Sequence, residues 1–538
     1  MRYPLRWTPS LKEQYARYWE DRTLWSFFEE NAARRPEKVA IVDGSNVVTY
    51  RQLASSVDSL TCSLIDLGTQ EGDSVAFQLP NWWEAMVLHL ALVRLSAVSV
   101  PIATIYRERE LSLILKDADV KAIVIPCRWK NCDYAAMIGR VSAPGLRAVI
   151  TCRGQVGSSL PFEDMLAERG RVPPIPRADP NSLSLILYTS GTTAEPKGVE
   201  HTQNTLMFEC RSIAELDQLT PEDVIFMASP ITHAGGVLNA LELPLRVGAK
   251  TVLMDNWNGA EAIRIIEKER VTWTMGATPF LQDIVQCESR PFHDISSLRL
   301  FVCGGASMTP ALIRSAAEAG IPVSRAYGSS EHPTISGFEK DPPSKAAQLD
   351  GRVHEHVQIK VETTADPRRP ALLGEVGEIC TKGPDLFIGY HQSKFNEEAF
   401  DEDGWFHTGD LGRVDDENYV QIVGRIKDII IRKGQKFSAK ELEDLLGEHP
   451  AVKECAVIGL PDDERGERVC SVVVLHPGWT LTLEDVRAFL TKAAIARQKF
   501  PEQLELVSAL PKTPSGKVRK FELRDSLSAG SEAARRDR

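Results

Sequence analysis

The sequence lacks closely paired cysteines. Its ten cysteines form no Cys-x-x-Cys pair, and the two nearest in sequence, Cys127 and Cys132, have no histidine cluster beside them. Zinc sites and disulfide frameworks depend on patterned cysteines, so both are disfavoured. We therefore expect reduced thiols in a protein of a reducing compartment, with a cytoplasmic location.

Positive charge and long apolar runs are also scarce. The formal net charge is -11, whereas a nucleic-acid-binding surface needs a basic face. The most apolar long stretch, 85–103, is interrupted by His89, Arg94 and Pro101, which indicates a buried helix running into a strand. No apolar segment follows the N-terminal arginines, so no signal peptide is expected. We predict no nucleic-acid partner and no integral membrane segment.

What the chain does contain is a regular alternation of strand-like and helix-like segments. Such alternation predicts an α/β fold class with largely parallel sheets, and 538 residues predict more than one domain. The first segments are strands at 75–79, 97–101 and 122–125 and helices at 82–95 and 108–116. Further strands are expected at 183–188, at 298–302 and near Val323.

The character of the sequence changes after Gly424. Short strands at 427–432, 452–458 and 469–475 and helices at 441–446 and 483–494 indicate a small, separate α+β unit. We therefore predict a large N-terminal domain of layered α/β subdomains (1–426) and a small C-terminal domain (427–525). The polar residues 526–538 are expected to be a disordered tail.

The sharpest local signal is the segment Tyr188-Thr-Ser-Gly-Thr-Thr-Ala-Glu-Pro-Lys-Gly-Val199. Its glycine allows backbone N–H groups to approach an anion, its hydroxyls donate hydrogen bonds and its lysine supplies charge, as a polyphosphate cradle requires. It is not a Walker A loop, because Gly-Lys-Ser/Thr is missing. The alternative is a solvent-exposed turn that binds no ligand. The candidate phosphate-binding residues are Thr189, Ser190, Gly191, Thr192, Thr193 and Lys197.

This segment resembles the phosphate-binding signature of the adenylate-forming superfamily, which includes the acyl-CoA synthetases. Four further segments resemble that family in the same order along the chain. They are Tyr327-Gly-Ser-Ser-Glu331, Trp405-Phe-His-Thr-Gly-Asp410, Gly424-Arg-Ile-Lys-Asp428 and Pro511-Lys-Thr-Pro-Ser-Gly-Lys517. The resemblance implies an enzyme that converts a carboxylic acid to its acyl-adenylate with ATP and then passes the acyl group to coenzyme A.

The resemblance also implies roles for individual residues in adenylation. Lys517 would bridge the carboxylate and the α-phosphate, and Glu331 would bind Mg²⁺ as a hard oxygen ligand. Asp410 and Arg425 would hold the ribose. The nucleotide would further contact Gly305, Ala306, Tyr327, Gly328 and Ser330. Taken singly, each has a plain alternative, such as a solvated lysine, a surface glutamate or a core tyrosine.

Three further assignments concern the substrate carboxylate and the thiol step. His233 takes the family position beside the carboxylate, although a lone histidine is more often structural. The family rotates its small, mobile C-terminal domain between the two half-reactions, and Lys427 matches the hinge. Gly434 matches the loop that lines the path of coenzyme A, and Lys433 or Lys436 would meet its phosphates, where solvated basic residues are the alternative.

The sequence excludes some classes of acid substrate but does not identify the acid. Ala234 stands where amino-acid-activating relatives have an aspartate, and Gly328 stands where acetate enzymes have a pocket-filling tryptophan. We therefore expect an apolar acid of medium length, or an alicyclic or polycyclic one. Two rivals stay open: an enzyme that loads a carrier-protein phosphopantetheine, and a non-catalytic ATP-binding module. The oligomeric state is open too, a homodimer being one option.

Overall fold

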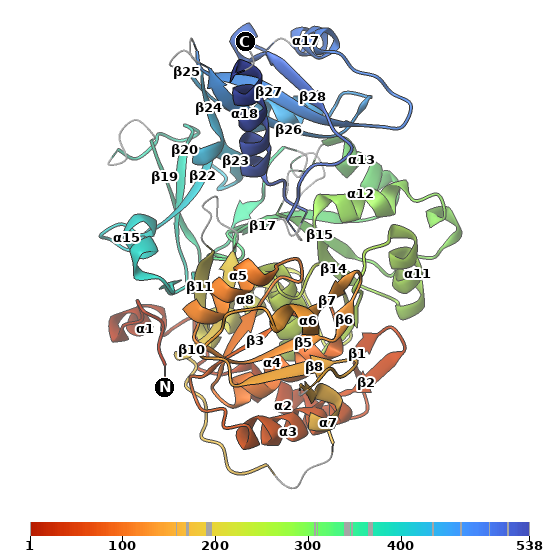
Figure 1. The fold of residues 1–538 in the computed structure, drawn as a ribbon, viewed down its shortest axis with the longest axis vertical. Coiled ribbons are helices and arrows are strands. Elements are labelled where there is room, and N and C mark those ends of the chain that lie inside the picture. Colours follow the sequence, from red (N-terminus) through yellow and green to blue (C-terminus); the bar gives the residue numbers. More distant parts are fainter. Residues whose placement is uncertain are drawn as a thin grey trace. The chain divides into compact units, whose positions relative to one another are not determined.

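The computed structural model describes residues 2–536 apart from short stretches (Figure 1). These residues divide into two compact units. The stretches left out are Ser158, 168–171, 190–195, 306–307, Thr309, 338–344, 346–347, 364–368, 433–434, 463–464, Ala494 and 514–515. The first unit consists of Met1–Gly304, Ala319–Ile335 and Gly383–Ala399. The second consists of Gly305–Glu318, Ser336–Lys382 and Phe400–Arg538.

These units do not follow the boundary at 426 that the sequence suggested. The chain leaves the first unit after Ile335, returns to it over Gly383–Ala399 and then leaves again. The sheet formed by β19 (Gln358–Glu362), β20 (Gly377–Lys382), β22 (Phe406–Val414) and β23 (Val420–Arg425) falls in the second unit. One reason is local: helix α16 (Ala439–Leu446) contacts β23.

The first unit contains largely parallel sheets, as the alternation predicted. One sheet has the order β21 (Gly389–Tyr390), β11 (Lys197–Thr202), β10 (Leu183–Thr189), β4 (Val98–Pro101), β3 (Ser74–Phe77), β5 (Val120–Pro126), β8 (Ala148–Cys152) and β9 (Leu160–Pro161). A second contains β16 (Val323–Tyr327), β15 (Leu300–Gly304), β14 (Trp273–Gly276), β12 (Val224–Met227), β13 (Lys250–Leu253), β1 (Val39–Asp43) and β2 (Asn46–Thr49). Only β21, β11 and β2 pair antiparallel with their neighbours in these two runs of strands.

The first unit also contains helices, most of which lie between these strands in sequence. They are α1 (Pro9–Tyr15), α2 (Leu24–Arg34), α3 (Tyr50–Asp66), α4 (Trp83–Arg94), α5 (Glu108–Asp117), α6 (Tyr134–Ile138), α7 (Phe162–Met165), α8 (Gln203–Leu216), α9 (Ala234–Gly236), α10 (Leu243–Val247), α11 (Gly259–Glu269), α12 (Thr278–Gln286) and α15 (Asn396–Ala399). Helix α3 begins at a capping box, in which the Thr49 hydroxyl accepts from Gln52 N–H and the Gln52 side chain accepts from Thr49 N–H.

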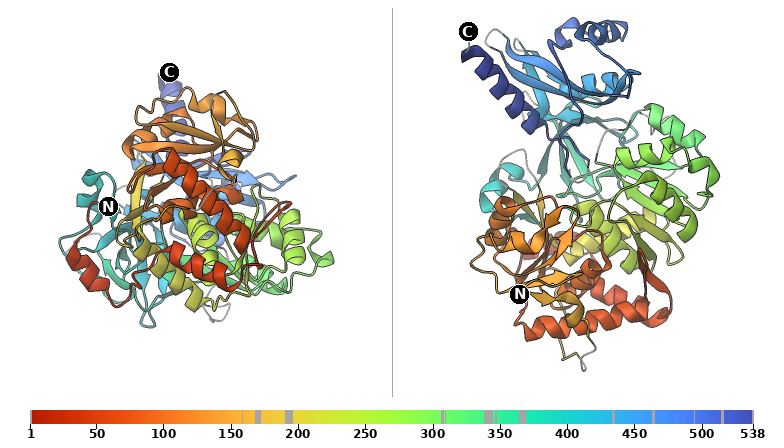
Figure 2. Two further views of the ribbon diagram at one scale, coloured as in Figure 1. Left: turned by 90° about the horizontal axis from the view of Figure 1, so that it is seen from below. Right: turned by 45° about the vertical axis from the view of Figure 1, so that its right-hand side comes forward.

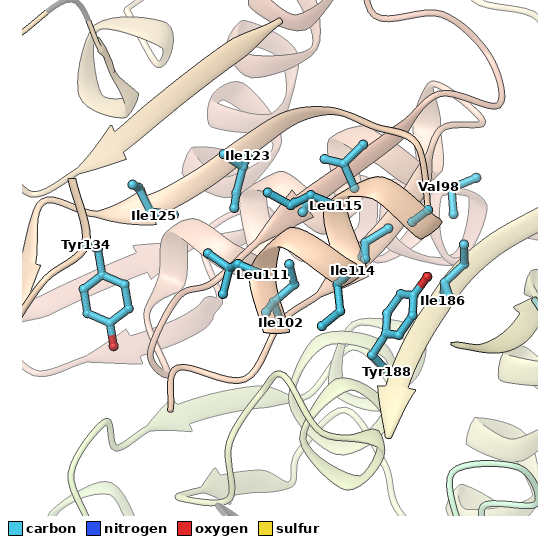
Figure 3. Packing of buried hydrophobic residues seen from close by; sticks show 14 of the residues in the cluster. Val98, Ile102, Leu111, Ile114, Leu115, Ile123, Ile125, Tyr134, Ile186 and Tyr188 are labelled. Atoms are coloured by element: carbon cyan, nitrogen blue, oxygen red, sulfur yellow. The ribbon is translucent and has the colours of Figure 1, made fainter. Parts of the chain in front are cut away.

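The first unit's α5 and the strands under it form one apolar cluster, part of which Figure 3 shows. Leu111, Ile114 and Leu115 recur at helical spacing along α5 and are fully or almost fully buried. They pack with Val98 and Ile123 from the neighbouring strands. This packing fixes the sheet whose β10 strand leads into the predicted phosphate loop.

Helix α4 is buried on all its faces, which explains why 85–93 is apolar at every position except His89. His89, the polar residue within it, is fully buried, and its Nε2 lies 2.7 Å from Glu242 Oε1. Its Nδ1 lies 3.1 Å from Ser99 Oγ. Both ring nitrogens thus have partners, as burial demands. Among the described residues no helix is long and apolar enough to cross a bilayer.

The second unit contains a sheet of β24 (Ile429–Arg432), β25 (Gln435–Ser438), β26 (Val452–Asp462), β27 (Gly466–Leu475) and β28 (Gln503–Leu506). Alternate residues of its strands face opposite sides. Val457 and Val473 pack with α16 and with α17 (Leu483–Lys492), whereas Ile458 and Val472 pack with Leu523 of α18 (Lys520–Arg536). Figure 2 shows α18 along the sheet.

The tail that the sequence predicts to be disordered begins at 526, whereas helix α18 continues to Arg536. Leu523 and Leu527 give that helix an apolar side that packs on the sheet. The predicted strands and helices of the C-terminal part are otherwise confirmed, with shifts of a few residues at their ends. The strand predicted at 427–432 starts later, because Ile426–Asp428 forms a 3-10 turn.

Candidate active site

The predicted phosphate loop joins two antiparallel strands. Thr189 ends β10, Lys197 begins β11, and the two are directly paired. Residues 190–195, which include Ser190, Gly191, Thr192 and Thr193, lie outside the described residues. The pairing nevertheless fixes both ends of the loop. Gly198 follows in a tight place, where an added Cβ would lie 3.0 Å from Ile186 Cγ2 and 3.2 Å from Tyr188 Cζ.

The ammonium group of Lys197 lies over two aromatic rings. Its Nζ is 4.4 Å from the ring centre of Phe395 and 4.8 Å from that of Tyr390. Ring faces attract cations, most strongly where water is reduced. The cation predicted to bind phosphate is therefore held at the strand end by the segment Gly383–Ala399.

The predicted metal ligand Glu331 sits in a tight loop after β16. Ile335 N–H donates to the Tyr327 carbonyl at 2.9 Å, and Ser329 Oγ accepts from the N–H groups of Glu331 and His332 at 3.2 Å each. The Ser330 carbonyl accepts from His201 Nε2 at 2.8 Å. Loop closure thus fixes the backbone on both sides of Glu331.

The structure gives Gly328 a role in loop closure that the sequence analysis did not assign to it. An added Cβ would lie 1.9 Å from the Pro333 carbonyl oxygen and 2.9 Å from the His332 carbonyl oxygen. The side of Gly328 where a side chain would project is thus filled by backbone of the same loop. The glycine is needed for loop closure, and its position says nothing about the depth available to an acyl chain.

Glu331 and Lys197 share one neighbour, Tyr390. The Tyr390 hydroxyl donates to Glu331 Oε1 at 2.7 Å, while its ring lies under Lys197 Nζ. Phe387 N–H donates to the Glu331 carbonyl at 2.7 Å. The structure therefore brings these two predicted residues together through a third residue that the sequence analysis missed.

A buried acidic pair lies behind the same loop. Burial and the nearby charge of Asp385 raise the pKa of Glu209 well above its usual range, which favours the protonated form of this carboxyl. Burial by itself would raise the pKa of Asp385, but His332 and a hydrogen bond with Glu209 lower it. His332 Nε2 lies 3.3 Å from Asp385 Oδ1, and Thr334 Oγ1 donates to Glu209.

His233 is exposed and stands immediately before the short helix α9. Its carbonyl accepts from Val237 N–H at 2.9 Å. A π-helix, Val237–Glu242, follows at once, and such turns are frequent at functional sites. Gly236 allows close packing, because an added Cβ would lie 2.0 Å from the Pro230 carbonyl oxygen.

The second unit joins the two predicted ribose ligands. Asp410 and Arg425 are paired residues of β22 and β23, and Arg425 Nε donates to Asp410 Oδ1 at 2.7 Å. Asp410 is buried, whereas Arg425 is partly exposed. Gly305, predicted to contact adenine, directly follows β15 with a positive φ of 79°, where glycine is favoured. Ala306 lies outside the described residues.

The predicted catalytic lysine ends a tight turn. Thr513 N–H donates to the Lys517 carbonyl at 2.8 Å, Lys517 N–H donates to Thr513 Oγ1 at 3.1 Å, and Gly516 takes a positive φ of 83°. The Lys517 side chain is exposed. The predicted hinge residue Lys427 is exposed too, and its carbonyl accepts from Arg524 Nη1 at 3.3 Å. Lys433 and Gly434 lie outside the described residues.

Comparison with known proteins agrees with this arrangement. Residues 28–391 match the AMP-binding enzyme family, and residues 441–517 match the AMP-binding enzyme C-terminal domain. The chain is 34% identical over 517 residues to the medium-chain fatty-acid–CoA ligase of Escherichia coli strain K12, covering 95% of this chain and 91% of the relative. It is 33% identical over 541 residues to salicylyl-CoA synthase / salicylate adenylyltransferase of a Streptomyces species, covering 96% of each.

A solved structure has the same fold. The ATP-bound MatB of Rhodopseudomonas palustris has a TM-score of 0.84 at 29% identity, over 94% of this chain and 99% of that one. Family matches over more than half of the chain decide its membership. The chain belongs to the AMP-binding enzyme family. This AMP-binding enzyme is an AMP-forming acid–thiol ligase, which first adenylates a carboxylic acid and then forms a thioester. ATP and coenzyme A fit that family as substrates.

One cluster of metal-ligand side chains in this AMP-binding enzyme was not foreseen. Ligand atoms of Glu362, Cys380 and His407 lie within 4.8 Å of one another, because Cys380 and His407 are paired across β20 and β22. Lys360 Nζ already lies 2.6 Å from Glu362 Oε1, and His407 Nδ1 lies 3.1 Å from a Glu378 oxygen. The cluster thus holds its own cation and hydrogen bonds, and needs no metal ion to explain it.

Proposed function

We propose that this AMP-binding enzyme activates an apolar acid of medium length, or one with an alicyclic or polycyclic skeleton, and transfers its acyl group to coenzyme A. The observation that carries the proposal is the position of Met275. A Cβ added to Gly304 would lie 3.3 Å from Met275 Cε, and one added to Gly235 would lie 3.8 Å from its Sδ. The thioether thus lies between two glycines, of which Gly235 is two residues after His233, and it adapts to apolar groups of several shapes.

Asn239 Nδ2 donates to Met275 Sδ at 2.9 Å, and the residues next to the two glycine-bearing segments are apolar, which supports an apolar substrate. Ala234, next to His233, is buried and brings no charge. Gly276 packs against aromatic rings, since an added Cβ would lie 3.0 Å from Phe280 and 3.2 Å from Phe301. The name of the 34%-identical relative, a medium-chain fatty-acid–CoA ligase, points to the same class of acid.

Burial of methylene groups gives the preference a magnitude. Each buried CH₂ contributes roughly 0.8 kcal/mol of transfer free energy. Five extra carbons therefore contribute about 4 kcal/mol, or near a thousandfold in kcat/KM, if the energy is retained in the transition state. Acetate would be the poorer substrate by that order of magnitude.

The first half-reaction brings two anions together, so its catalysis rests on placed positive charge. In this proposal Lys517 bridges the acid's carboxylate and the α-phosphate, and Lys197 binds the phosphate chain. Asp410 and Arg425 orient the ribose. Glu331 offers the hard carboxylate oxygen that suits Mg²⁺, and its firmly held loop fits a metal ligand. When bound, Mg²⁺ neutralises phosphate charge as pyrophosphate leaves.

The second half-reaction needs a thiol where Lys517 acted. In this proposal Lys427 is the hinge about which the C-terminal domain turns, and Lys433 and Gly434 then line the path of coenzyme A. The alternative acceptor is a carrier-protein phosphopantetheine. Parallel assays with coenzyme A and with a loaded carrier protein separate the two, because only the true acceptor raises AMP production after the adenylate forms.

A pyrophosphate-release screen across carboxylic acids tests the acid preference. We expect kcat/KM to rise steeply from acetate to acids of six to twelve carbons. Met275→Ala should favour bulkier acids. The ratio of kcat/KM for a bulkier acid to kcat/KM for the best acid of the unmutated enzyme should rise about tenfold, the scale of a few methylenes in an apolar pocket. Met137→Ala, a buried methionine in a different apolar cluster, is the matched control. Equal kcat/KM for acetate and dodecanoate in the unmutated enzyme contradicts the proposal.

A further inference from the structure

The segment Gly383–Ala399 returns to the first unit between two stretches of the second. It is attached there at several points. Trp19 Nε1 donates to the Pro384 carbonyl at 2.8 Å, and Ile388 N–H donates to the Glu200 carbonyl at 2.9 Å. Tyr390 N–H donates to Asn396 Oδ1 at 2.7 Å, which fixes the turn after β21. The segment is therefore a rigid support rather than a passing connection.

This support contacts the Glu331 loop at three places. His332 faces Asp385, Phe387 N–H donates to the Glu331 carbonyl, and the Tyr390 hydroxyl donates to the Glu331 carboxylate. His332 and Asp385 are buried, as is Tyr390. Loop backbone and carboxylate are thus held by one short piece of chain.

We propose that Tyr390 is a positioning residue that sets the Glu331 carboxylate and the Lys197 ammonium in one fixed relation before ATP binds. Its hydroxyl fixes the rotamer of Glu331, and its ring carries Lys197 together with Phe395. The inference rests on the proposed roles of Glu331 and Lys197. According to this proposal, the Glu331 carboxylate needs the Tyr390 hydroxyl, and the Lys197 ammonium needs the Tyr390 ring, to be correctly placed.

The physical reason lies in preorganisation. A carboxylate that binds a metal–phosphate complex acts best when its orientation is already fixed, because ordering it during binding costs free energy. A hydrogen bond from a buried phenol to a charged acceptor is stronger than one between neutral groups. The Asp385–His332 contact keeps the support and the loop together, so the tyrosine hydroxyl stays within reach of Glu331.

Tyr390→Phe isolates the hydroxyl, because the ring under Lys197 remains. We expect the Mg²⁺ concentration for half-maximal adenylation and the KM for ATP to rise about tenfold, on the scale of one lost charge-assisted hydrogen bond. The KM for the acid should stay within twofold. Tyr50→Phe is the matched control, since its buried hydroxyl donates to the Ala249 carbonyl at 2.8 Å, away from these residues. It should leave all three constants unchanged.

Phe395→Leu tests the other half of the proposal. It removes one ring beneath Lys197 while the Tyr390–Glu331 hydrogen bond remains, so the KM for ATP should rise without a change in the Mg²⁺ requirement. Binding of Mn²⁺ in the presence of ATP, followed by water-proton relaxation, reports the metal site without turnover. It should weaken in Tyr390→Phe and not in Phe395→Leu.

Glu331→Gln separates failure of this inference from failure of the proposed function. If Glu331→Gln weakens Mn²⁺ binding and Tyr390→Phe does not, the positioning role is wrong and the metal ligand stands. If Glu331→Gln itself leaves the metal requirement unchanged, the proposed role of Glu331 is wrong. Should Tyr390→Phe lower the melting temperature, Asp385→Asn is the second variant. It must also raise the Mg²⁺ requirement, and an unchanged requirement there overturns the proposal.

Discussion

Asp410 and Arg425 meet side chain to side chain as paired residues of β22 and β23, with Arg425 Nε 2.7 Å from Asp410 Oδ1. Asp410 is buried and Arg425 is partly exposed. The arginine therefore orients a carboxylate that the ribose hydroxyls are proposed to reach. The two predicted ribose ligands form one group, in which the loss of either disturbs the other.

We predict that Asp410→Asn raises the KM for ATP by tenfold or more and leaves the KM for the acid unchanged. Arg425→Lys should give a smaller rise, since lysine keeps the charge but loses the planar fork that orients a carboxylate. Steady-state kinetics with each substrate varied in turn measures both effects. An equal change in the two KM values would contradict a ribose-specific role.

Lys517→Ala tests the proposed catalytic cation. Adenylation should fall by about 10²-fold or more, the scale of losing one preorganised charge donor. Thioester formation from synthetic acyl-adenylate should fall far less, because the lysine is proposed to have moved away by then. Single-turnover assays of the two half-reactions measure this, with Lys512→Ala as a neighbouring control. Equal losses in both half-reactions of a folded variant remove the assignment.

Lys427→Pro tests the hinge. Proline fixes φ near -65° and restricts the residue before it, so one orientation of the C-terminal domain should be trapped. We expect a selective loss of thioester formation while adenylation is largely retained. Turnover equal to that of the unmutated enzyme would show that residue 427 does not change conformation between the steps.

The sequence allowed the α/β class and most element positions to be predicted because they depend on local periodicity. The strand predicted at 97–101 is β4, and the helix predicted at 108–116 is α5. Tyr390 was missed because its partner Glu331 is 59 residues away, and no spacing rule relates them. The Cys380–His407 neighbourhood was missed for the same reason, since it arises from strand pairing.

Gly328 shows where reasoning from residue size failed. A glycine in place of a tryptophan suggested an open acyl pocket, but the direction of a Cβ depends on loop closure, which the sequence does not reveal. Because that direction points into the Pro333 carbonyl, Gly328→Ala should displace the Glu331 loop. We expect adenylation of short and long acids to fall by the same factor. Gly139→Ala, where an added Cβ meets its nearest atom at 3.6 Å, should be silent. If Gly328→Ala lowers adenylation of the longer acids alone, Gly328 does border the acyl pocket, as the sequence suggested.

Glu209 gives a prediction for stability against pH. Burial and the charge of Asp385 raise its pKa, so the folded chain keeps this proton to a higher pH than an unfolded glutamate, whose pKa is about 4.3. The contribution of this group to stability is therefore fully present below the unfolded pKa and is lost as the pH rises toward the folded pKa. The loss approaches about 1.4 kcal/mol per pH unit for one proton.

Glu209→Gln removes this titration and keeps much of the hydrogen bonding. The amide oxygen can accept from Thr334 Oγ1 and the amide N–H can donate to Asp385, as the protonated carboxyl does. As the pH rises from 5 to 8, the denaturant concentration at the unfolding midpoint should therefore become higher for the variant than for the unmutated enzyme. Glu37→Gln, on a side chain that is 75% exposed, should follow the unmutated enzyme throughout. If the unfolding midpoints of Glu209→Gln and the unmutated enzyme change in parallel with pH, Glu209 is ionised in the folded chain. It then does not donate a hydrogen bond to Asp385.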